Sequence, residues 1–406
     1  MLTNSIINKV EHKLRDLGLP LAVDFWNEKI VAGVTPAVAT LKFSTPSTLM
    51  LLANPSLGQL AENYVEGRVD FQGRIRDVID LMGPFISLPD APKKLLNLNR
   101  LKFWRHNRFS DRKAVSSHYD VSNEFYALWL DRRRVYSCAY FKRDDDSLEV
   151  AQEQKLDHIC RKLALKPGER FLDIGCGWGG LIFWAAENYG VSSVGITISQ
   201  NQYDYVHDYV HSHGLAGKVD VRLMDYRDLP DAEPFDKIAS VGMFEHVGVR
   251  NLPVYFRKIY SLLKPGGLVM NHGITSASFD DETMDTANRE FIDKYVFPDG
   301  ELTHISKVLE AMAREGLECS DVENLRPHYA KTLWYWVDRL EMNADKAREL
   351  GGERNFRIWR TYMSGFAVAF ERNWDAIFQV LAGKPMAGGK PAYPLNREYM
   401  YLPQLK

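Results

Sequence analysis

The fold of this chain is decided by one stretch, Phe171-Leu172-Asp173-Ile174-Gly175-Cys176-Gly177-Trp178-Gly179-Gly180. Its apolar first half predicts a short buried strand, which ends near an acidic residue and runs directly into glycines that open a helix. The glycines at 175, 177 and 179 carry no Cβ, so a ligand can approach the backbone of this turn closely. The stretch therefore predicts an α/β domain that binds a nucleotide-like ligand.

The position of the acidic residue separates two ligand classes that use such turns. In dinucleotide sites the acid comes about 20 residues after the turn, and the helix N-terminus is left to the pyrophosphate. Here Asp173 lies at the end of the first strand, and the position that follows the next strand is Thr197. This arrangement favours S-adenosylmethionine (SAM), whose cationic end would face the carboxylate, over NAD.

Composition indicates a globular protein with more than one domain. The 406 residues carry a formal net charge of −2, which argues against a protein that binds nucleic acid over its whole surface. The four cysteines show no metal-type spacing, so no metal and no disulfide scaffold are expected. The sequence shows neither a signal-peptide pattern nor the roughly 18 apolar residues that span a bilayer. We expect a cytoplasmic protein, associated peripherally with the inner membrane face if its substrate is a lipid.

Three segments are expected along the chain. Residues 1–90 contain short apolar runs and no ligand motif, which predicts a small α+β accessory domain with a lipid or dimer role. Residues 91–115 form a basic-aromatic linker, because eight cations and one acid lie between Lys93 and Lys113, interleaved with Leu, Phe and Trp. This linker is either simply solvated, or docks on anionic lipid head groups, or contacts nucleic acid. Residues 116–406 are assigned to the catalytic domain.

From about residue 150, short strands and helices alternate along the sequence. After the glycine turn, strands are expected at residues 193–197, 219–224, 235–241 and 268–272. The pattern predicts a parallel, doubly wound, Rossmann-like sheet with its site at the carboxyl ends of the strands. Five residues fall at such ends, namely Asp173, Thr197, Asp225, Gly242 and His272.

Two further side chains at this edge have catalytic chemistry. Glu245 follows the fourth strand, where a carboxylate can act as a base or fix another group, although an acid at a helix N-terminus also interacts favourably with the helix dipole. His272 ends the fifth strand. A lone histidine is often structural, but the neighbouring Glu245 favours a functional role for it.

Five sequence blocks occur in an order that is typical of one family. They are residues 117–126 (SHYDVSNEFY), 136–141 (YSCAYF), 172–180 (LDIGCGWGG), 197–202 (TISQNQ) and 244–248 (FEHVG). Together they resemble the cyclopropane-fatty-acyl-phospholipid synthase family, which includes the mycolic acid cyclopropane synthases and related SAM-dependent lipid C-methyltransferases. The resemblance covers about residues 116–374 and extends less distinctively to the first 90 residues. One departure is that residues 362–366 lack the cysteine that the longer synthases carry in this helix.

The resemblance implies two sets of ligands. In addition to Asp173, it implies that SAM is held by Tyr136, Ser137, Gly175, Gly177, Thr197, Gln202, Asp225 and Tyr226. It also implies a bicarbonate ion bound by Cys138, Gly242, Glu245, His272, Ile274 and Tyr329. Of these, the catalytic residues are expected to be Cys138, Glu245, His272 and Tyr329.

The implied reaction adds a methylene unit from SAM to the cis double bond of an unsaturated phospholipid acyl chain. Methyl transfer to the alkene leaves a carbocation, and a weak base such as bicarbonate then removes a proton from the new methyl to close a cyclopropane ring. The enzyme would work at a bilayer surface, and a homodimer is one option for its assembly. One helical face either lines an acyl channel or packs in the core, and carries Trp359, Met363, Phe366 and Phe370.

Three alternatives stay open. A related C-methyltransferase would give a methylene- or methyl-branched acyl chain from the same cation. A non-catalytic lipid-binding scaffold would have no need of Asp173, the glycine turn, Glu245 and His272 together. A small-molecule O- or N-methyltransferase would leave Cys138, Tyr329 and the basic-aromatic segment unexplained.

Overall fold

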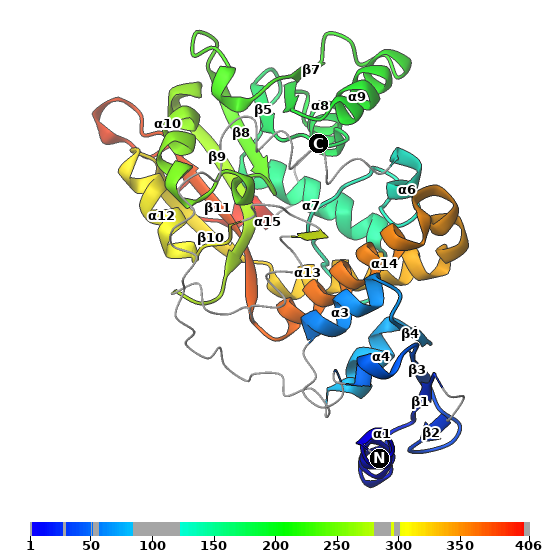
Figure 1. Ribbon diagram of the computed structural model, residues 1–406. Helices are drawn as coiled ribbons and strands as arrows, with labels where there is room; N and C mark the ends of the chain where they lie inside the picture. The colour runs from blue at the N-terminus through cyan, green and yellow to red at the C-terminus, as the bar shows by residue number, and fades with distance from the viewer. Residues whose placement is uncertain are drawn as a thin grey trace. The chain divides into compact units, whose positions relative to one another are not determined.

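The structure is a computed structural model that describes residues 2–26, 30–49, 51, 57–83, 122–279, 294–295 and 301–401 (Figure 1). The chain divides into two compact units. The N-terminal unit comprises Met1–Leu95, Glu282–Pro298 and Val337–Phe366, and the sheet unit comprises Leu96–Asp281, Asp299–Trp336 and Ala367–Lys406. The domain boundaries expected near residues 90 and 115 lie outside the described residues, as do the basic-aromatic linker and residues 117–121.

The sheet unit is built on seven strands in the order β10-β11-β9-β8-β5-β6-β7. Their bounds are β5 Arg170–Ile174, β6 Ser192–Thr197, β7 Val219–Leu223, β8 Phe235–Val241, β9 Leu263–Ser276, β10 Glu318–Asn324 and β11 Asp375–Gly383. The five strands from β9 to β7 pair in parallel, which confirms the expected Rossmann-like sheet. Strand β11 runs antiparallel to both of its neighbours, β9 and β10.

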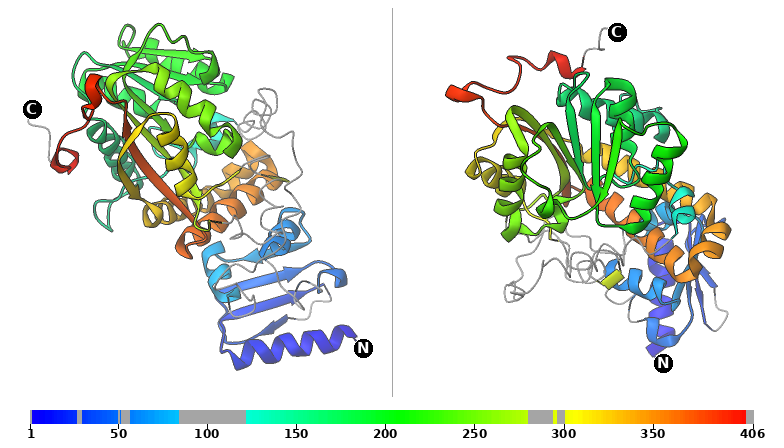
Figure 2. Two further views of the ribbon diagram at one scale, coloured as in Figure 1. Left: turned by 90° about the vertical axis from the view of Figure 1, so that its left-hand side faces the viewer. Right: turned by 90° about the horizontal axis from the view of Figure 1, so that it is seen from above.

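Helices cover both faces of this sheet (Figure 2). One face carries α7 Leu148–Lys162, α8 Gly180–Tyr189 and α9 Gln200–Ser212, and the other carries α10 Leu252–Leu262 and α12 Ile305–Arg314. Further helices are α6 Asn123–Ala127, α13 Arg326–Met342, α14 Ala344–Glu371 and α15 Glu398–Tyr401. Serine side chains at positions 122, 147 and 199 cap α6, α7 and α9 by accepting a backbone N–H, which fixes where these helices begin.

The N-terminal unit has the small α+β fold that the sequence predicts. Its sheet has the order β2-β1-β3-β4, with β1 Leu21–Phe25, β2 Ile30–Ala32, β3 Ala39–Phe43 and β4 Val69–Gln72. The helices α1 Leu2–Asp16, α3 Leu57–Val65 and α4 Ile75–Met82 accompany it. Alternate residues of β3 are buried in a core that includes Leu14, Val23, Leu41 and Phe43.

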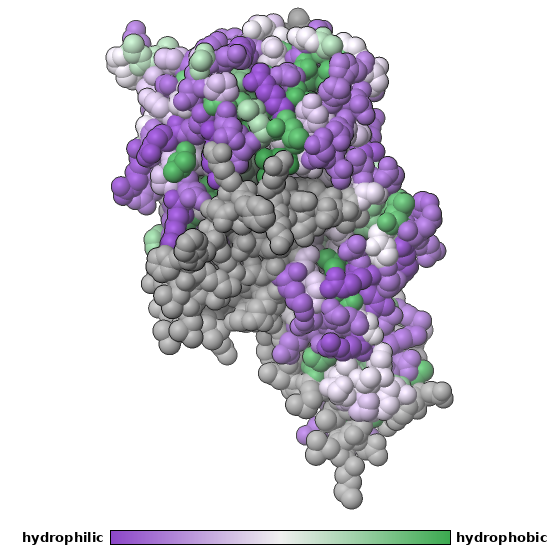
Figure 3. Space-filling view, turned by 45° about the horizontal axis from the view of Figure 1, so that its top comes forward, coloured by the Kyte–Doolittle hydropathy of each residue, from purple (hydrophilic) through white to green (hydrophobic). Residues whose placement is uncertain are grey.

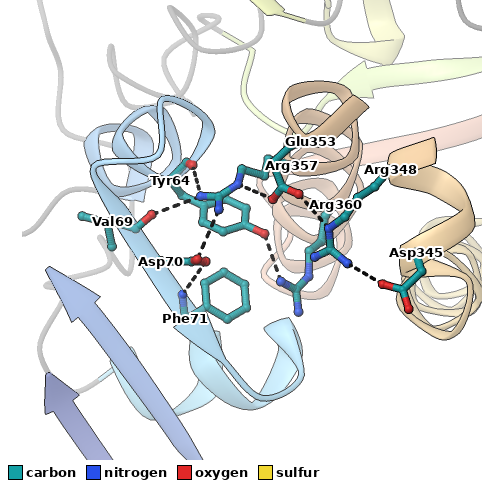
Figure 4. A network of polar contacts seen from close by, with 9 residues as sticks. All are labelled: Tyr64, Val69, Asp70, Phe71, Asp345, Arg348, Glu353, Arg357 and Arg360. Carbon is teal, nitrogen blue, oxygen red and sulfur yellow. Dashed lines mark hydrogen bonds and ion pairs between the residues drawn. The ribbon is translucent and has the colours of Figure 1, made fainter. Parts of the chain in front are cut away.

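Residues 337–366 pack with the N-terminal unit, whereas the sequence analysis grouped them with the catalytic domain. Two arginines of α14 explain this grouping (Figure 4). Arg357 donates to the backbone oxygen of Tyr64 at 2.8 Å, and the buried Arg360 donates to the Tyr64 hydroxyl at 3.0 Å. Arg360 also pairs with Glu341 of α13. A buried guanidinium has to be paired, so these contacts hold the helical segment to α3 of the same unit.

Candidate functional site

A cavity lies at the carboxyl ends of β5, β6, β7 and β8. Every residue that was assigned to SAM lines it: Tyr136, Ser137, Asp173, Gly175, Gly177, Thr197, Gln202, Asp225 and Tyr226. Parallel strands end at the same edge of a sheet, which is why residues from four separate strand-to-helix turns meet here. The cavity is therefore the candidate cofactor site.

The glycines of the first turn have different roles. Gly175, Gly177 and Gly179 all adopt positive φ, at 83°, 54° and 84°. A Cβ at Gly179 would lie 2.6 Å from the Phe183 ring, so this glycine permits close helix packing. A Cβ at Gly177 or at Gly242 would meet no atom within 4 Å among the described residues. These two glycines face open space in the cavity, and the space beside their backbones is available to a ligand.

Asp173 provides a test of whether the cavity fits SAM. Its side chain is 3% exposed, and Oδ1 has no hydrogen-bond partner in the described part of the chain. Burial raises the pKa of this carboxyl to about 7, while the nearby Lys155 lowers it. A buried, unsatisfied carboxylate is costly unless a ligand pairs with it. The α-ammonium group of SAM would supply that partner, so the residues present fit this ligand.

Contacts at the next two strand ends order the rest of the cavity wall. Thr197 donates its hydroxyl to Gln202 Oε1 at 2.8 Å, which links the end of β6 to the first turn of α9. The Asp225 carboxylate accepts from the backbone N–H of Arg227 and also pairs with its guanidinium at 2.6 Å. A ligand that contacts Asp225 would have to share this carboxylate with Arg227.

Of the six residues assigned to bicarbonate, Gly242 lines the cavity, and Glu245 lies close beside it. Glu245 is buried in the short 3-10 helix Phe244–His246, where its Oε1 accepts the backbone N–H of Ile274 at 2.7 Å. Its other oxygen, Oε2, has no partner among the described residues. Burial raises the pKa of Glu245 to about 7, although the Ile274 N–H lowers it. At neutral pH this carboxyl group can either hold or release a proton.

His272 lies inside a strand, so the expectation that it ends the fifth strand is wrong. Strand β9 continues to Ser276 because β11 keeps pairing with it beyond the last residue of β8. His272 still lies opposite Val241, the last residue of β8, at the level of the cavity edge. Its Nδ1 is 3.3 Å from Gln379 Nε2, and Nε2 has no partner in the described chain. Burial lowers the pKa of His272 well below its usual value, so the ring is neutral.

A series of contacts places the last two residues of this group beside the same strand. The buried Cys138 Sγ lies 3.9 Å from the backbone oxygen of Leu325, and burial raises the pKa of this thiol, so it stays protonated. Tyr329, in the first turn of α13, donates its backbone N–H to the same oxygen at 3.1 Å. Leu325 in turn donates to Ile377, which pairs with Ile274 across β9 and β11. The assignment of these residues as anion ligands stays a prediction.

The four residues considered for an acyl channel are all buried, as both the channel and the core interpretation require. One of them, Phe370, packs its ring on Tyr329 with centroids 4.8 Å apart. This contact puts an aromatic face beside a residue of the predicted anion site. Aromatic faces stabilise nearby positive charge.

The sequence analysis missed a polar face of α7. This helix buries four polar side chains at helical spacing, Gln152, Lys155, His158 and Lys162. Gln152 Nε2 donates to the backbone oxygens of Val135 and Ser137, and Lys155 lines the cavity. The available signal was the repeat of polar residues at spacings of three and four along one face of a helix that follows the YSCAYF block.

Comparisons with known proteins agree with this geometry. The sequence matches the family described as mycolic acid cyclopropane synthetase over residues 106–380. A probable fatty acid methyltransferase of Pseudomonas putida is 44% identical over 394 residues, covering 96% of this chain and 98% of that protein. The cyclopropane-fatty-acyl-phospholipid synthase of Escherichia coli is 40% identical over 272 residues, covering 67% of this chain and 68% of that protein.

A solved structure shows the same fold. The mycolic acid cyclopropane synthase CmaA1, complexed with SAH and CTAB, matches this chain with a TM-score of 0.64 and 34% identity. The match covers 67% of this chain and 98% of that one.

Proposed function

We propose a substrate and a base for this chain, which belongs to the mycolic acid cyclopropane synthetase family and is a SAM-dependent methyltransferase. The proposed substrate is the cis double bond of an unsaturated phospholipid acyl chain, and the proposed product is a cyclopropane ring. One observation carries the proposal: beside the SAM cavity, Glu245 Oε2 and His272 Nε2 are buried without partners in the described chain. Buried polar atoms normally have hydrogen-bond partners, so two unpaired ones near the same strand indicate a binding site for a small polar ligand.

The residues of the cavity can serve methyl transfer in two ways, by holding SAM and by aligning it with the alkene. SAM supplies an electrophilic methyl group when it is bound, and Asp173 with the glycine turn would hold it at the cavity edge. An unactivated alkene is a weak nucleophile, so alignment of the two reactants is the main contribution that the protein can make. Such positioning is worth up to about 7–11 kcal/mol. In this transfer the bond between the methyl carbon and the sulfonium sulfur would break, with its electron pair left on sulfur. The π electron pair of the alkene would form the new bond from one alkene carbon to the methyl carbon, and the other alkene carbon would become cationic.

Ring closure requires loss of one proton from the new methyl group. Bicarbonate, when bound, would supply the weak base for this proton. The neutral His272 accepts at Nδ1 from Gln379, so its Nε2 carries the hydrogen and can donate to an anion. Glu245, with a pKa of about 7, can receive the proton at neutral pH. The ring closes as the C–H electron pair forms the third carbon–carbon bond.

A methyl- or methylene-branched product is the second candidate. It is favoured by the 44% identity to a probable fatty acid methyltransferase along almost the whole chain. The same cation gives a methyl-branched alkene if a proton is lost from a neighbouring chain carbon instead. It gives a methylene branch if a hydride first shifts from the methyl-bearing carbon to the cationic carbon and the methyl group then loses a proton. Which proton leaves depends on where the base lies relative to the two alkene carbons.

The product assay is expected to separate these reactions. The chain would be expressed in a bacterial host that lacks such an enzyme, and the phospholipid acyl chains analysed by mass spectrometry. We expect acyl chains heavier by about 14 mass units (one CH₂) that resist hydrogenation, as a ring does. Chains that take up hydrogen and become methyl-branched would support the second candidate. An unchanged lipid profile, with the protein folded and able to bind SAM, would contradict both.

We propose that the enzyme reaches its substrate from the membrane surface. Among the described residues, no helix combines the length and apolar character needed to cross a membrane. Hydrophilic side chains predominate over the described part of the face shown in Figure 3. The basic-aromatic segment between Lys93 and Lys113, outside the described residues, is the proposed contact for anionic head groups.

Reversal of three cations in this segment, Lys102, Arg105 and Arg108, to glutamate is expected to weaken binding to anionic vesicles by at least about tenfold, because each cation near such a surface is worth about 1 kcal/mol. Added salt should release the unmodified protein, since the attraction is screened. Co-sedimentation measures both effects, with SAM affinity as the control. Equal binding of both proteins to these vesicles would place the docking surface elsewhere.

A further inference from the structure

Lys155 is a buried cation in the wall of the SAM cavity. Its side chain is 2% exposed, it lines the cavity, and its Nζ donates to the Ser137 hydroxyl at 2.9 Å. Burial lowers the pKa of Lys155 to about 8, so the amine still carries its proton at neutral pH. An ammonium group has three N–H donors. Within the described residues the Ser137 hydroxyl is the one hydrogen-bond partner of this ammonium, which leaves donors for a ligand.

Lys155 and Asp173 are opposite charges in one cavity that do not pair with each other. Each lowers the cost of burying the other, yet no ion pair within 4.0 Å joins them in the described chain. Separated charges of this kind match a zwitterion, whose two ends would satisfy both at once. The amino-acid end of SAM is such a group, with an α-ammonium and an α-carboxylate on one carbon.

We propose that Lys155, together with the Ser137 hydroxyl it holds, binds the α-carboxylate of SAM, while Asp173 binds the α-ammonium. The proposal deepens the proposed function, because it assigns a ligand group to a residue of the same cavity. Helix α7 positions this arrangement through two residues one turn apart, since Gln152 holds the backbone of Ser137 and Lys155 holds its side chain. Lys155 is then a determinant of specificity for ligands that carry a carboxylate.

A structural role is the competing explanation for Lys155. The charged and titratable groups that act on it are Asp131, Cys138, Asp173 and Cys160, and Asp131 has the largest effect. However, Asp131 already accepts the backbone N–H groups of Arg133 and Val135, at 2.9 and 2.8 Å. No ion pair within 4.0 Å joins Asp131 to Lys155 in the described chain. A purely structural lysine would affect all ligands of the cavity alike, which gives the test.

Two ligands that differ only in the carboxylate separate these explanations. SAM and decarboxylated SAM share the adenosine, the sulfonium and the amine. Calorimetry with Lys155→Met should show SAM binding weakened about 10- to 100-fold, as expected for loss of a charge-assisted hydrogen bond, with decarboxylated SAM little changed. Lys155→Arg, which keeps the charge, should recover part of the preference for SAM. Asp173→Asn should weaken both ligands, because both carry the amine.

Lys237→Met is the matched control. Lys237 is also buried, with burial lowering its pKa, but it lies in β8 beside Glu169 and outside the cavity lining. This variant should bind both ligands as the unmodified protein does. Equal weakening of both ligands by Lys155→Met, or an unchanged preference for SAM, would overturn the assignment. If Lys155→Met does not fold, the unmodified protein still gives an answer, since equal affinity for the two ligands would overturn it as well.

Failure of this inference can be distinguished from failure of the proposed function. A protein that binds neither ligand would contradict the SAM site itself. A protein that binds SAM and makes the expected product, but does not discriminate against the decarboxylated ligand, would contradict the role of Lys155 alone.

Discussion

Replacing Asp173 with asparagine is expected to weaken SAM binding by about 10- to 100-fold, and at the same time to stabilise the ligand-free protein. The affinity falls because a charge-assisted hydrogen bond to the ligand ammonium, worth about 1.5–3 kcal/mol, becomes a neutral one in a buried site. The stability rises because the unmodified protein buries a carboxylate that has no partner at Oδ1 among the described residues. Calorimetry measures the first effect and thermal unfolding the second.

The raised pKa of Asp173 determines how the stability difference between the two proteins depends on pH. Burial raises the pKa of Asp173 from 3.8 to about 7. Between pH 3.8 and about pH 7, the carboxyl group therefore carries a proton in the folded state but not in the unfolded state. The free energy of unfolding of the unmodified protein therefore falls as the pH rises from about 4 to about 7. Asparagine does not titrate, so its advantage should grow over this range and level off above it, reaching on the order of 4 kcal/mol.

Asp236→Asn should have the opposite effect on stability. Although burial alone would raise its pKa, the contacts with Lys264 and the Arg170 N–H lower it, so this carboxylate stabilises the fold when it is charged. The variant should be less stable than the unmodified protein above about pH 4 and should bind SAM normally, because Asp236 does not line the cavity. A destabilised Asp173→Asn with unchanged SAM affinity would mean that Asp173 is a structural residue.

The parallel half of the sheet could be predicted because each strand carries its own signal. Apolar runs ending at Asp173, Thr197 and Asp225 lie within a residue or two of the ends of β5, β6 and β7. Of the two antiparallel strands, β11 has an apolar sequence, DAIFQVLAG, but β10 carried no such signal. Strand β10, at the edge of the sheet, has a mostly half-buried or exposed sequence, ECSDVEN, with no apolar alternation. The end of β9 is set by its long-range pairing with β11, which local sequence does not encode.

The residues of the candidate site also fall into a group that the sequence predicts and a group that it does not. All nine SAM residues line the cavity, and seven of them lie at or after strand ends, where the sheet topology brings them together; Tyr136 and Ser137 come from the segment before α7. Lys155 and Gln379 escaped the sequence analysis because their function depends on which face of α7 or β11 is buried. A lysine in a helix and a glutamine in a strand look like surface residues until the fold shows them 2% and 0% exposed.

Replacing Glu245 with glutamine is expected to reduce turnover by about 10²- to 10⁴-fold, the usual contribution of a positioned acid–base group. Glutamine keeps the size of the side chain and can still accept from the Ile274 N–H, but it cannot take up a proton. SAM affinity should stay within about twofold, because Glu245 does not line the SAM cavity. Calorimetry and a vesicle turnover assay, read together, separate a chemical defect from a binding defect.

Bicarbonate gives the second half of this test. Turnover by the unmodified protein should fall in carbonate-depleted buffer and return when bicarbonate is added, whereas Glu245→Gln should respond weakly.

The raised pKa of Glu245, about 7, also predicts an effect on stability, because the unmodified protein buries a charged carboxylate at higher pH. Above about pH 7, Glu245→Gln should therefore unfold at a higher temperature than the unmodified protein. Full activity of the variant, with no bicarbonate dependence in either protein, would remove Glu245 from the chemistry. Lost activity with lowered stability at every pH would mean that the variant disturbs the fold and not a proton transfer.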